Sequence, residues 1–211
     1  MSHRALVGII GMVALVAACS DSSTNGTSGV TPSSSPMSVS TETPPATSTL
    51  PFAGAPKVAV PLPSSALSGD PCTDALTTEQ VMQALGAQVQ GEPNKIDKIG
   101  PSCEWFNRDT TGKVTVTFVT ETRVGLSGLY QNSKSGDSSW KELPLMHGFP
   151  AVAHNKVTSS CQVSIGFADD RSVDVTTHLG LNKGGGKTDP CEVAPQVAEL
   201  VVATLKKKAG A

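Results

Sequence analysis

Four cysteines place the strongest constraint on how this 211-residue chain can fold. Cys72 and Cys191 each end an Asp-Pro-Cys triplet that opens a helical pattern, whereas Cys103 and Cys161 each follow a serine and open a strand pattern. Four cysteines allow three connectivities. Because the two halves repeat the same order of motifs at separations of 31 and 30 residues, we expect the pairs Cys72–Cys103 and Cys161–Cys191.

The fifth cysteine, Cys19, belongs to a different pattern at the N-terminus. His3 and Arg4 precede fourteen uncharged residues, 5–18, a length typical of a signal peptide and too short to span a bilayer. The segment Leu15-Val16-Ala17-Ala18-Cys19 resembles the bacterial lipobox. The resemblance implies that residues 1–18 are removed and that Cys19 becomes a thioether-linked, N-acylated N-terminus. The alternative is an ordinary secreted protein with an incidental cysteine.

An exported location determines how the other cysteines are interpreted. Disulfides form in oxidising compartments, so an even number of cysteines in an exported chain favours two intradomain bridges. A metal site is the rival hypothesis. The chain has no Cys-x-x-Cys motif and no histidine at ligand spacing from the four cysteines, so we expect no metal and no cofactor.

The segment after Cys19 has the composition of a tether. Of the 31 residues in 20–50, 23 are Ser, Thr, Pro or Gly, and residues 51–63 continue with more proline and scattered apolar residues. Such a sequence buries too little apolar surface to offset the entropy lost on ordering. We therefore expect a lipidated cysteine and a disordered tether over residues 19–63, followed by a single domain over residues 64–211.

Capping signals predict helices at both ends of that domain. Asp70 and Asp189 are suited to cap helices whose next residue is proline. Thr77 and Gln80 have the spacing of a capping box, and Gly86 provides a stop signal. In the C-terminal segment we expect Pro195 to separate a short turn from the final helix.

Between these helices the hydrophobic period is two, which is typical of strands. Residues 114–118, 161–167 and 173–175 alternate between apolar and polar side chains, with turn signals at residues 109–112 and 169–170. The sequence therefore predicts an α+β fold, an antiparallel sheet with N-terminal and C-terminal helices and two intradomain disulfides.

The order of these motifs is similar to that of a known family. The Asp-Pro-Cys helix starts, the Ser-Cys-Glu-Trp segment at residues 102–105 and the Gly-Phe-Pro-Ala-Val segment at residues 148–152 resemble the actinobacterial lipoproteins with domain of unknown function 3558, a class that includes the mycobacterial LprB and LprC lipoproteins. The resemblance implies a cell-envelope location and supplies no catalytic residues. The family also leads us to expect a continuous last helix, from which Pro195 departs.

The few aromatic residues are the best candidates for a ligand pocket. Trp105, Phe106 and Trp140 are the candidates to line a site for an apolar or sugar ligand. We favour the alternative, in which Trp105 packs on a disulfide and fills the core. His147, His154 and His178 are expected in loops or at the surface. Spacing alone leaves a Ser-His-Asp arrangement open, because such triads assemble in space.

The net charge of −2 argues against a nucleic-acid partner. We expect a lipoprotein anchored through Cys19 to the outer face of the plasma membrane. Its domain would be a non-enzymatic binding or accessory module for a lipid, glycolipid or protein partner. The alternative is an envelope hydrolase, or an accessory subunit of a cell-wall enzyme or transporter.

Overall fold

A computed structural model describes residues 49–155, 157–180 and 189–211, so the predicted signal peptide, the predicted lipidation site Cys19 and most of the predicted tether lie outside the described residues. The elements follow one another in an α+β order that agrees with the predicted fold class. They are η1 (Ser64–Leu67), α1 (Pro71–Asp74), α2 (Thr78–Leu85), β1 (Gly91–Ile96), β2 (Gly100–Phe106), β3 (Lys113–Val119), α3 (Gly125–Asn132), β4 (Ser139–Met146), β5 (Phe149–Asn155), β6 (Ser160–Ala168), β7 (Arg171–His178) and α4 (Pro190–Ala209).

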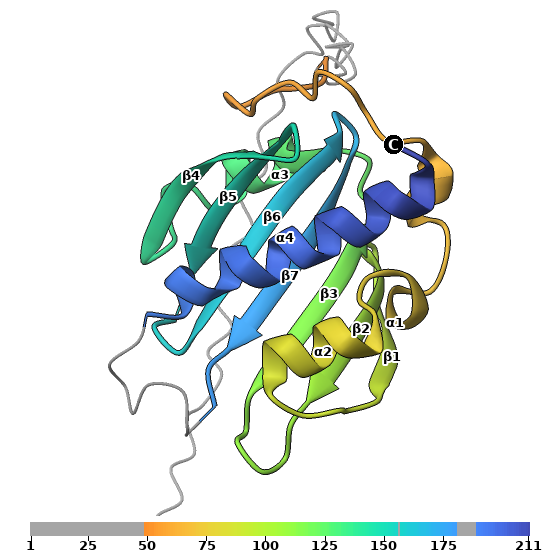
Figure 1. Ribbon diagram of the computed structural model, residues 1–211. Coiled ribbons are helices and arrows are strands. Elements are labelled where there is room, and N and C mark those ends of the chain that lie inside the picture. The colour runs from red at the N-terminus through yellow and green to blue at the C-terminus, as the bar shows by residue number, and fades with distance from the viewer. Residues whose placement is uncertain (1–48, 156, 181–188) are drawn as a thin grey trace, which may run out of the picture. The chain divides into compact units, whose positions relative to one another are not determined.

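The strands form one antiparallel sheet in the order β1-β2-β3-β7-β6-β5-β4. Strands β3 and β7 pair with each other and join the two groups of consecutive strands. The long helix α4 crosses one face of the sheet, with α1 and α2 beside it over β1–β3 (Figure 1). We call this the helix face.

Alternation along the strands separates the helix face from the opposite face. On β6, Cys161, Val163, Ile165 and Phe167 are buried in the main core together with Val201 and Leu205 of α4. The intervening residues of β6 point to the opposite face. A second, smaller core on that face contains Leu126 and Tyr130 of α3, packed with Ala55 and with Val152 of β5.

Both disulfides form as predicted, Cys72–Cys103 and Cys161–Cys191. Each joins the start of a helix to a strand next to the central β3–β7 pair. Asp70 accepts a hydrogen bond from the Cys72 amide, and Asp189 accepts one from the Cys191 amide, both at 2.8 Å. The capping box of Thr77 and Gln80 at the start of α2 also forms.

The expectation that Pro195 interrupts the last helix is wrong, because α4 runs without a break from Pro190 to Ala209. Proline at this position removes one hydrogen bond to the preceding turn, that is, to the Cys191 carbonyl. The disulfide holds Cys191 against β6, and the apolar side chains of α4 after Pro195 are buried in the core. Packing therefore maintains a helix that the local sequence would interrupt.

The predicted start of the domain at Ser64 is too late. Residues 52–62 form a strap across the ends of the strands. The Leu62 amide donates to the Phe167 carbonyl at 2.9 Å, and the Val58 amide donates to Asp169 Oδ1 at 2.9 Å. The Phe52 amide donates to the Ser127 hydroxyl at 3.0 Å. Because the Val58 and Leu62 side chains are also buried, the strap belongs to the domain.

Candidate functional site

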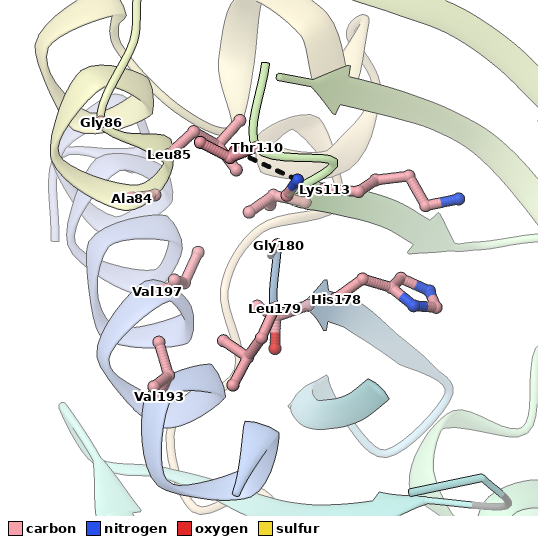
Figure 2. Close-up of a pocket in the computed structure, with 13 residues that line it drawn as sticks. Ala84, Leu85, Gly86, Thr110, Lys113, His178, Leu179, Gly180, Val193 and Val197 are labelled. Carbon is pink, nitrogen blue, oxygen red and sulfur yellow. Dashed lines mark hydrogen bonds between the residues drawn. The ribbon is translucent and has the colours of Figure 1, made fainter. Parts of the chain in front are cut away.

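An apolar cavity lies between the sheet and the helices of the helix face. It has a volume of about 240 Å³. Its walls come from the end of α2, the first turns of α4 and the adjoining ends of β3 and β7 (Figure 2). The apolar side chains in its lining are Ala84, Leu85, Val114, Leu179, Val193 and Val197.

Hydrogen bonds attach the first turn of α2 to α4. In its first turn, Gln80 accepts a hydrogen bond from the Thr204 hydroxyl at 2.9 Å and donates one to the Leu200 carbonyl at 3.3 Å. The last turn of α2 instead faces Val193 and Val197 across the cavity (Figure 2). The hydrogen-bonded first turn of α2 thus holds its last turn in place beside the cavity.

Main-chain contacts shape the strand side of the cavity. Asn107 donates to the Leu85 carbonyl at 3.1 Å and so connects the β2–β3 turn to the end of α2. Gly180 approaches this turn so closely that an added Cβ would lie 2.1 Å from the Thr110 carbonyl oxygen. Any side chain at Gly180 would therefore displace the turn.

Two basic residues, Lys113 and His178, line the cavity with their main chain and not with their charged side chains. The side chains of Lys113 and His178 point away from the apolar residues (Figure 2), towards the opposite face of the sheet. Lys113 forms an ion pair of 3.2 Å with Glu104. Burial, assisted by the charge of Lys113, lowers the pKa of His178 below its ordinary value. The interior is therefore suited to an apolar group.

The structure does not bring the three predicted pocket aromatics together. Trp105 is buried in the main core beside the Cys72–Cys103 disulfide. The Cys103 sulfur and the Trp105 ring both lie against Gly91, where an added Cβ would meet the two of them. Phe106 follows Trp105 on the opposite face and is exposed. Trp140 lies on β4, at the other edge of the sheet. None of them lines the apolar cavity.

Trp140 instead belongs to an aromatic cluster beside the second core. Its ring meets the Tyr130 ring edge-on, with centroids 5.1 Å apart, and lies 5.7 Å from the His154 ring. Burial, together with the nearby charge of Glu142, raises the pKa of Tyr130 to about 12. Lys134 covers the outer side of the cluster, 4.9 Å from the Tyr130 centroid. The rings of Trp140, Tyr130 and His154 therefore pack against one another.

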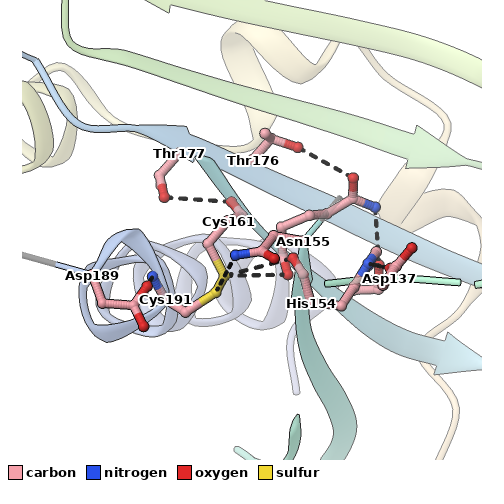
Figure 3. The surroundings of a disulfide bond; sticks show 10 residues. Asp137, His154, Asn155, Cys161, Thr176, Thr177, Asp189 and Cys191 are labelled. Atoms are coloured by element: carbon pink, nitrogen blue, oxygen red, sulfur yellow. Dashed lines mark hydrogen bonds and ion pairs between the residues drawn. A yellow bond between two sulfur atoms is a disulfide. The ribbon is translucent and has the colours of Figure 1, made fainter. Parts of the chain in front are cut away.

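His154 lies on β5 and is buried rather than exposed, so the prediction of a loop or surface position is wrong for this histidine. Its Nδ1 lies 2.6 Å from Asp137 Oδ2, and its Nε2 lies 3.2 Å from Ser164 Oγ. The Ser164 hydroxyl in turn donates to Asp174 Oδ1 at 2.6 Å. The main chain of His154 adjoins the Cys161–Cys191 disulfide (Figure 3), since the Cys161 sulfur lies 3.6 Å from the His154 carbonyl oxygen.

Ser164, His154 and Asp137 are the residue types of a catalytic triad, but the serine is not accessible to a substrate. Ser164 is 1% exposed, in the middle of β6, and its hydroxyl hydrogen bond goes to a carboxylate. A nucleophilic serine must instead reach a substrate and donate to its base. Burial raises the pKa of Asp174, although the hydrogen bond from Ser164 opposes the rise. The arrangement links β5, β6 and β7 through buried side-chain hydrogen bonds and so stabilises the strands.

Sequence reasoning missed both the cavity and this network. The cavity walls come from four separate parts of the chain and contain no motif. The network joins the segment before β4 to β5, β6 and β7. The sequence signal for this network was the possibility of a Ser-His-Asp arrangement. Spacing along the chain could not show which of these residues meet in the fold. Within the residues that the structure describes, no group of three or more His, Cys, Asp or Glu side chains is positioned to hold a metal ion.

Comparison with protein families identifies the chain at the level of its domain. A family model described as a protein of unknown function, DUF3558, matches residues 14–204. The chain belongs to the DUF3558 family. The matched range of this DUF3558 protein includes Cys19 and all four disulfide cysteines. No curated protein and no solved structure gives a significant match.

The described helices were also compared with the requirements for crossing a bilayer. None of those within residues 49–155, 157–180 and 189–211 combines the necessary length and apolarity.

Proposed function

We propose that this DUF3558 protein is a cell-envelope lipoprotein whose domain binds a small apolar group, such as part of an acyl chain, in the cavity between α2, α4 and the sheet. Cys19 would carry the lipid anchor and hold the protein at the outer face of the plasma membrane. The lipobox-like sequence and the resemblance to actinobacterial lipoproteins support this location.

The apolar cavity is the observation that carries the proposal. At about 240 Å³ it is slightly smaller than typical small-molecule sites of roughly 300–1,000 Å³, so it suits part of a ligand. The few polar groups in the lining, such as the Thr110 and Thr177 hydroxyls, give it little capacity to bind a charged group. An apolar group would gain roughly 25 cal/mol for each Å² of surface removed from water.

The His154 network is the observation that bears on the alternative, an envelope hydrolase. Because Ser164 is buried and donates to Asp174, the network favours a structural role over nucleophilic catalysis. A binding or accessory role is therefore the better-supported proposal. The ligand could be part of a lipid, part of a glycolipid or an apolar side chain of a partner protein, and all three present an apolar group.

The proposal is tested by titrating the full chain, in a neutral detergent below its micelle concentration, with dodecanoate as a simple acyl-chain probe. Val193→Phe should fill the cavity and weaken binding at least tenfold, because Val193 lines the cavity on the first turn of α4. The matched control is Ala203→Phe, which adds the same ring at an exposed position of the same helix.

Ala203→Phe should bind dodecanoate like the unmodified chain. Equal weakening by both substitutions would assign the effect to the helix rather than to the cavity. If the unmodified chain binds no dodecanoate, or if Val193→Phe binds it with unchanged affinity, the proposed apolar site is wrong.

A further inference from the structure

A second, more open groove lies at the other end of the β3–β7 pair and has a different chemistry. Its volume is about 750 Å³. One wall is η1, directly after the strap, and the other comes from the residues that follow β3 and from the start of β7. Ser64, Ser65, Ser68 and Thr120 contribute hydroxyl groups to the lining.

Two arginines add positive charge to this groove. Arg171 Nε donates to Asp170 Oδ1 at 3.0 Å, and Arg123 Nη1 donates to Asp170 Oδ2 at 3.4 Å. The Arg171 side chain is only 16% exposed and is held in place, whereas that of Arg123 is 69% exposed. A single carboxylate thus orients two guanidinium groups beside the groove.

The charges around the groove do not cancel. Burial acts to raise the pKa of Asp170, but the hydrogen bonds and charges of Arg171 and Arg123 outweigh it and hold that pKa below its usual range. Asp170 therefore remains an anion that balances one of the two arginines. Glu121, which also lines the groove, forms an ion pair with Lys95 at 3.0 Å. Arg123, Arg171, Asp170, Glu121 and Lys95 together carry one net positive charge.

This combination of groups identifies a class of ligand. Guanidinium groups have several N–H donors in a fixed plane and bind phosphate oxygens in pairs. A phosphate group alone would fill only part of 750 Å³, and the remaining wall is rich in hydroxyl groups. We propose that the groove binds a phosphorylated polyol of the glycerol phosphate type, either free in solution or as the head group of a phospholipid.

The proposal does not depend on the apolar cavity. The cavity adjoins Lys113 and His178, whereas the groove adjoins Thr120 and Arg171, and these pairs lie at opposite ends of β3 and β7. A failure of acyl-chain binding would leave the groove unaffected, and the reverse also holds. The two sites can therefore be tested separately.

The test measures binding of sn-glycerol 3-phosphate to the full chain by titration calorimetry. In parallel, the full chain carrying Cys19→Ser is sedimented with vesicles of phosphatidylglycerol or of phosphatidylcholine. Arg123→Gln and Arg171→Gln should each weaken binding about tenfold or more, because each removes a hydrogen bond between charged groups. Arg108→Gln is the matched control, since Arg108 is exposed in the β2–β3 turn outside the groove.

Each outcome has a definite meaning. Binding of glycerol phosphate in solution supports a free ligand, and binding only to phosphatidylglycerol vesicles supports a lipid head group. If neither probe binds, or if Arg108→Gln weakens binding as much as Arg123→Gln does, the proposal is overturned. Should Arg171→Gln destabilise the domain, Arg123→Gln still decides, because the Arg123 side chain is exposed and its ion pair with Asp170 lies at the surface.

Discussion

Leu62 offers a direct test of whether the strap belongs to the folded domain. Its side chain is 6% exposed and packs into the main core, and its amide donates to the Phe167 carbonyl. Leu62→Ala removes the buried side chain and leaves this main-chain hydrogen bond possible. The substitution therefore isolates the packing contribution of the strap.

The expected loss follows from burial. Replacing a buried leucine by alanine destabilises a protein by about 2–5 kcal/mol, depending on how far the site relaxes. Because the strap lies at the periphery of the core, we expect the lower part of that range, about 2–3 kcal/mol. For a domain of this size, each kcal/mol corresponds to roughly 2–4 °C in Tm, so the melting temperature should fall by about 4–12 °C.

Val60→Ala is the matched control in the same segment. The Val60 side chain is 76% exposed, so its truncation should change stability by less than about 0.5 kcal/mol. The measurement is thermal unfolding of the full chain followed by circular dichroism. If Leu62→Ala and Val60→Ala melt at the same temperature as the unmodified chain, the strap does not pack on the domain and the boundary near residue 64 is restored.

Three further predictions concern the lipid anchor, the Asp174 carboxylate and the Cys161–Cys191 disulfide. Cys19→Ser should move the chain from the detergent phase to the aqueous phase in phase partitioning, and its retention in detergent would require another anchor. Because the pKa of Asp174 is raised in the folded state, its protonation stabilises the fold fully below about pH 4 and this stabilisation is lost as pH rises through the folded pKa. Asp174→Asn should therefore gain stability relative to the unmodified chain between pH 4 and pH 7 in denaturant titrations, and a relative loss would contradict the assignment. Replacing Cys161 and Cys191 together by serine should cost ~3–4 kcal/mol, the loop-closure value for a bridge of this span, and an unchanged unfolding midpoint would show that the bridge contributes nothing to stability.

The sequence predicts those parts of the fold whose side chains alternate between two environments. Strands β3, β6 and β7 each pack one face against the main core, so their period of two was visible. Strand β1 is almost entirely exposed, and every residue of β5 is buried. Neither strand shows alternation, because its two faces have similar environments.

The parts that were not predicted depend on contacts between distant segments. Helix α3 contains Gly125 and Gly128 and makes no side-chain capping hydrogen bond, so its local sequence gives little helical signal. The strap has buried apolar residues without any period, since main-chain hydrogen bonds to Phe167 and Asp169 set its course. The cysteine pairing was predictable because the same motifs occur in both halves of the domain.

The apolar cavity is tested most directly by native mass spectrometry of the full chain purified from its own host under conditions that retain ligands. The account predicts a bound apolar molecule that disappears when the protein is denatured and is absent from the Val193→Phe variant but present in Ala203→Phe. A host-purified protein that releases no non-covalent ligand and also fails to bind added dodecanoate would contradict the account, as would a ligand retained equally by Val193→Phe.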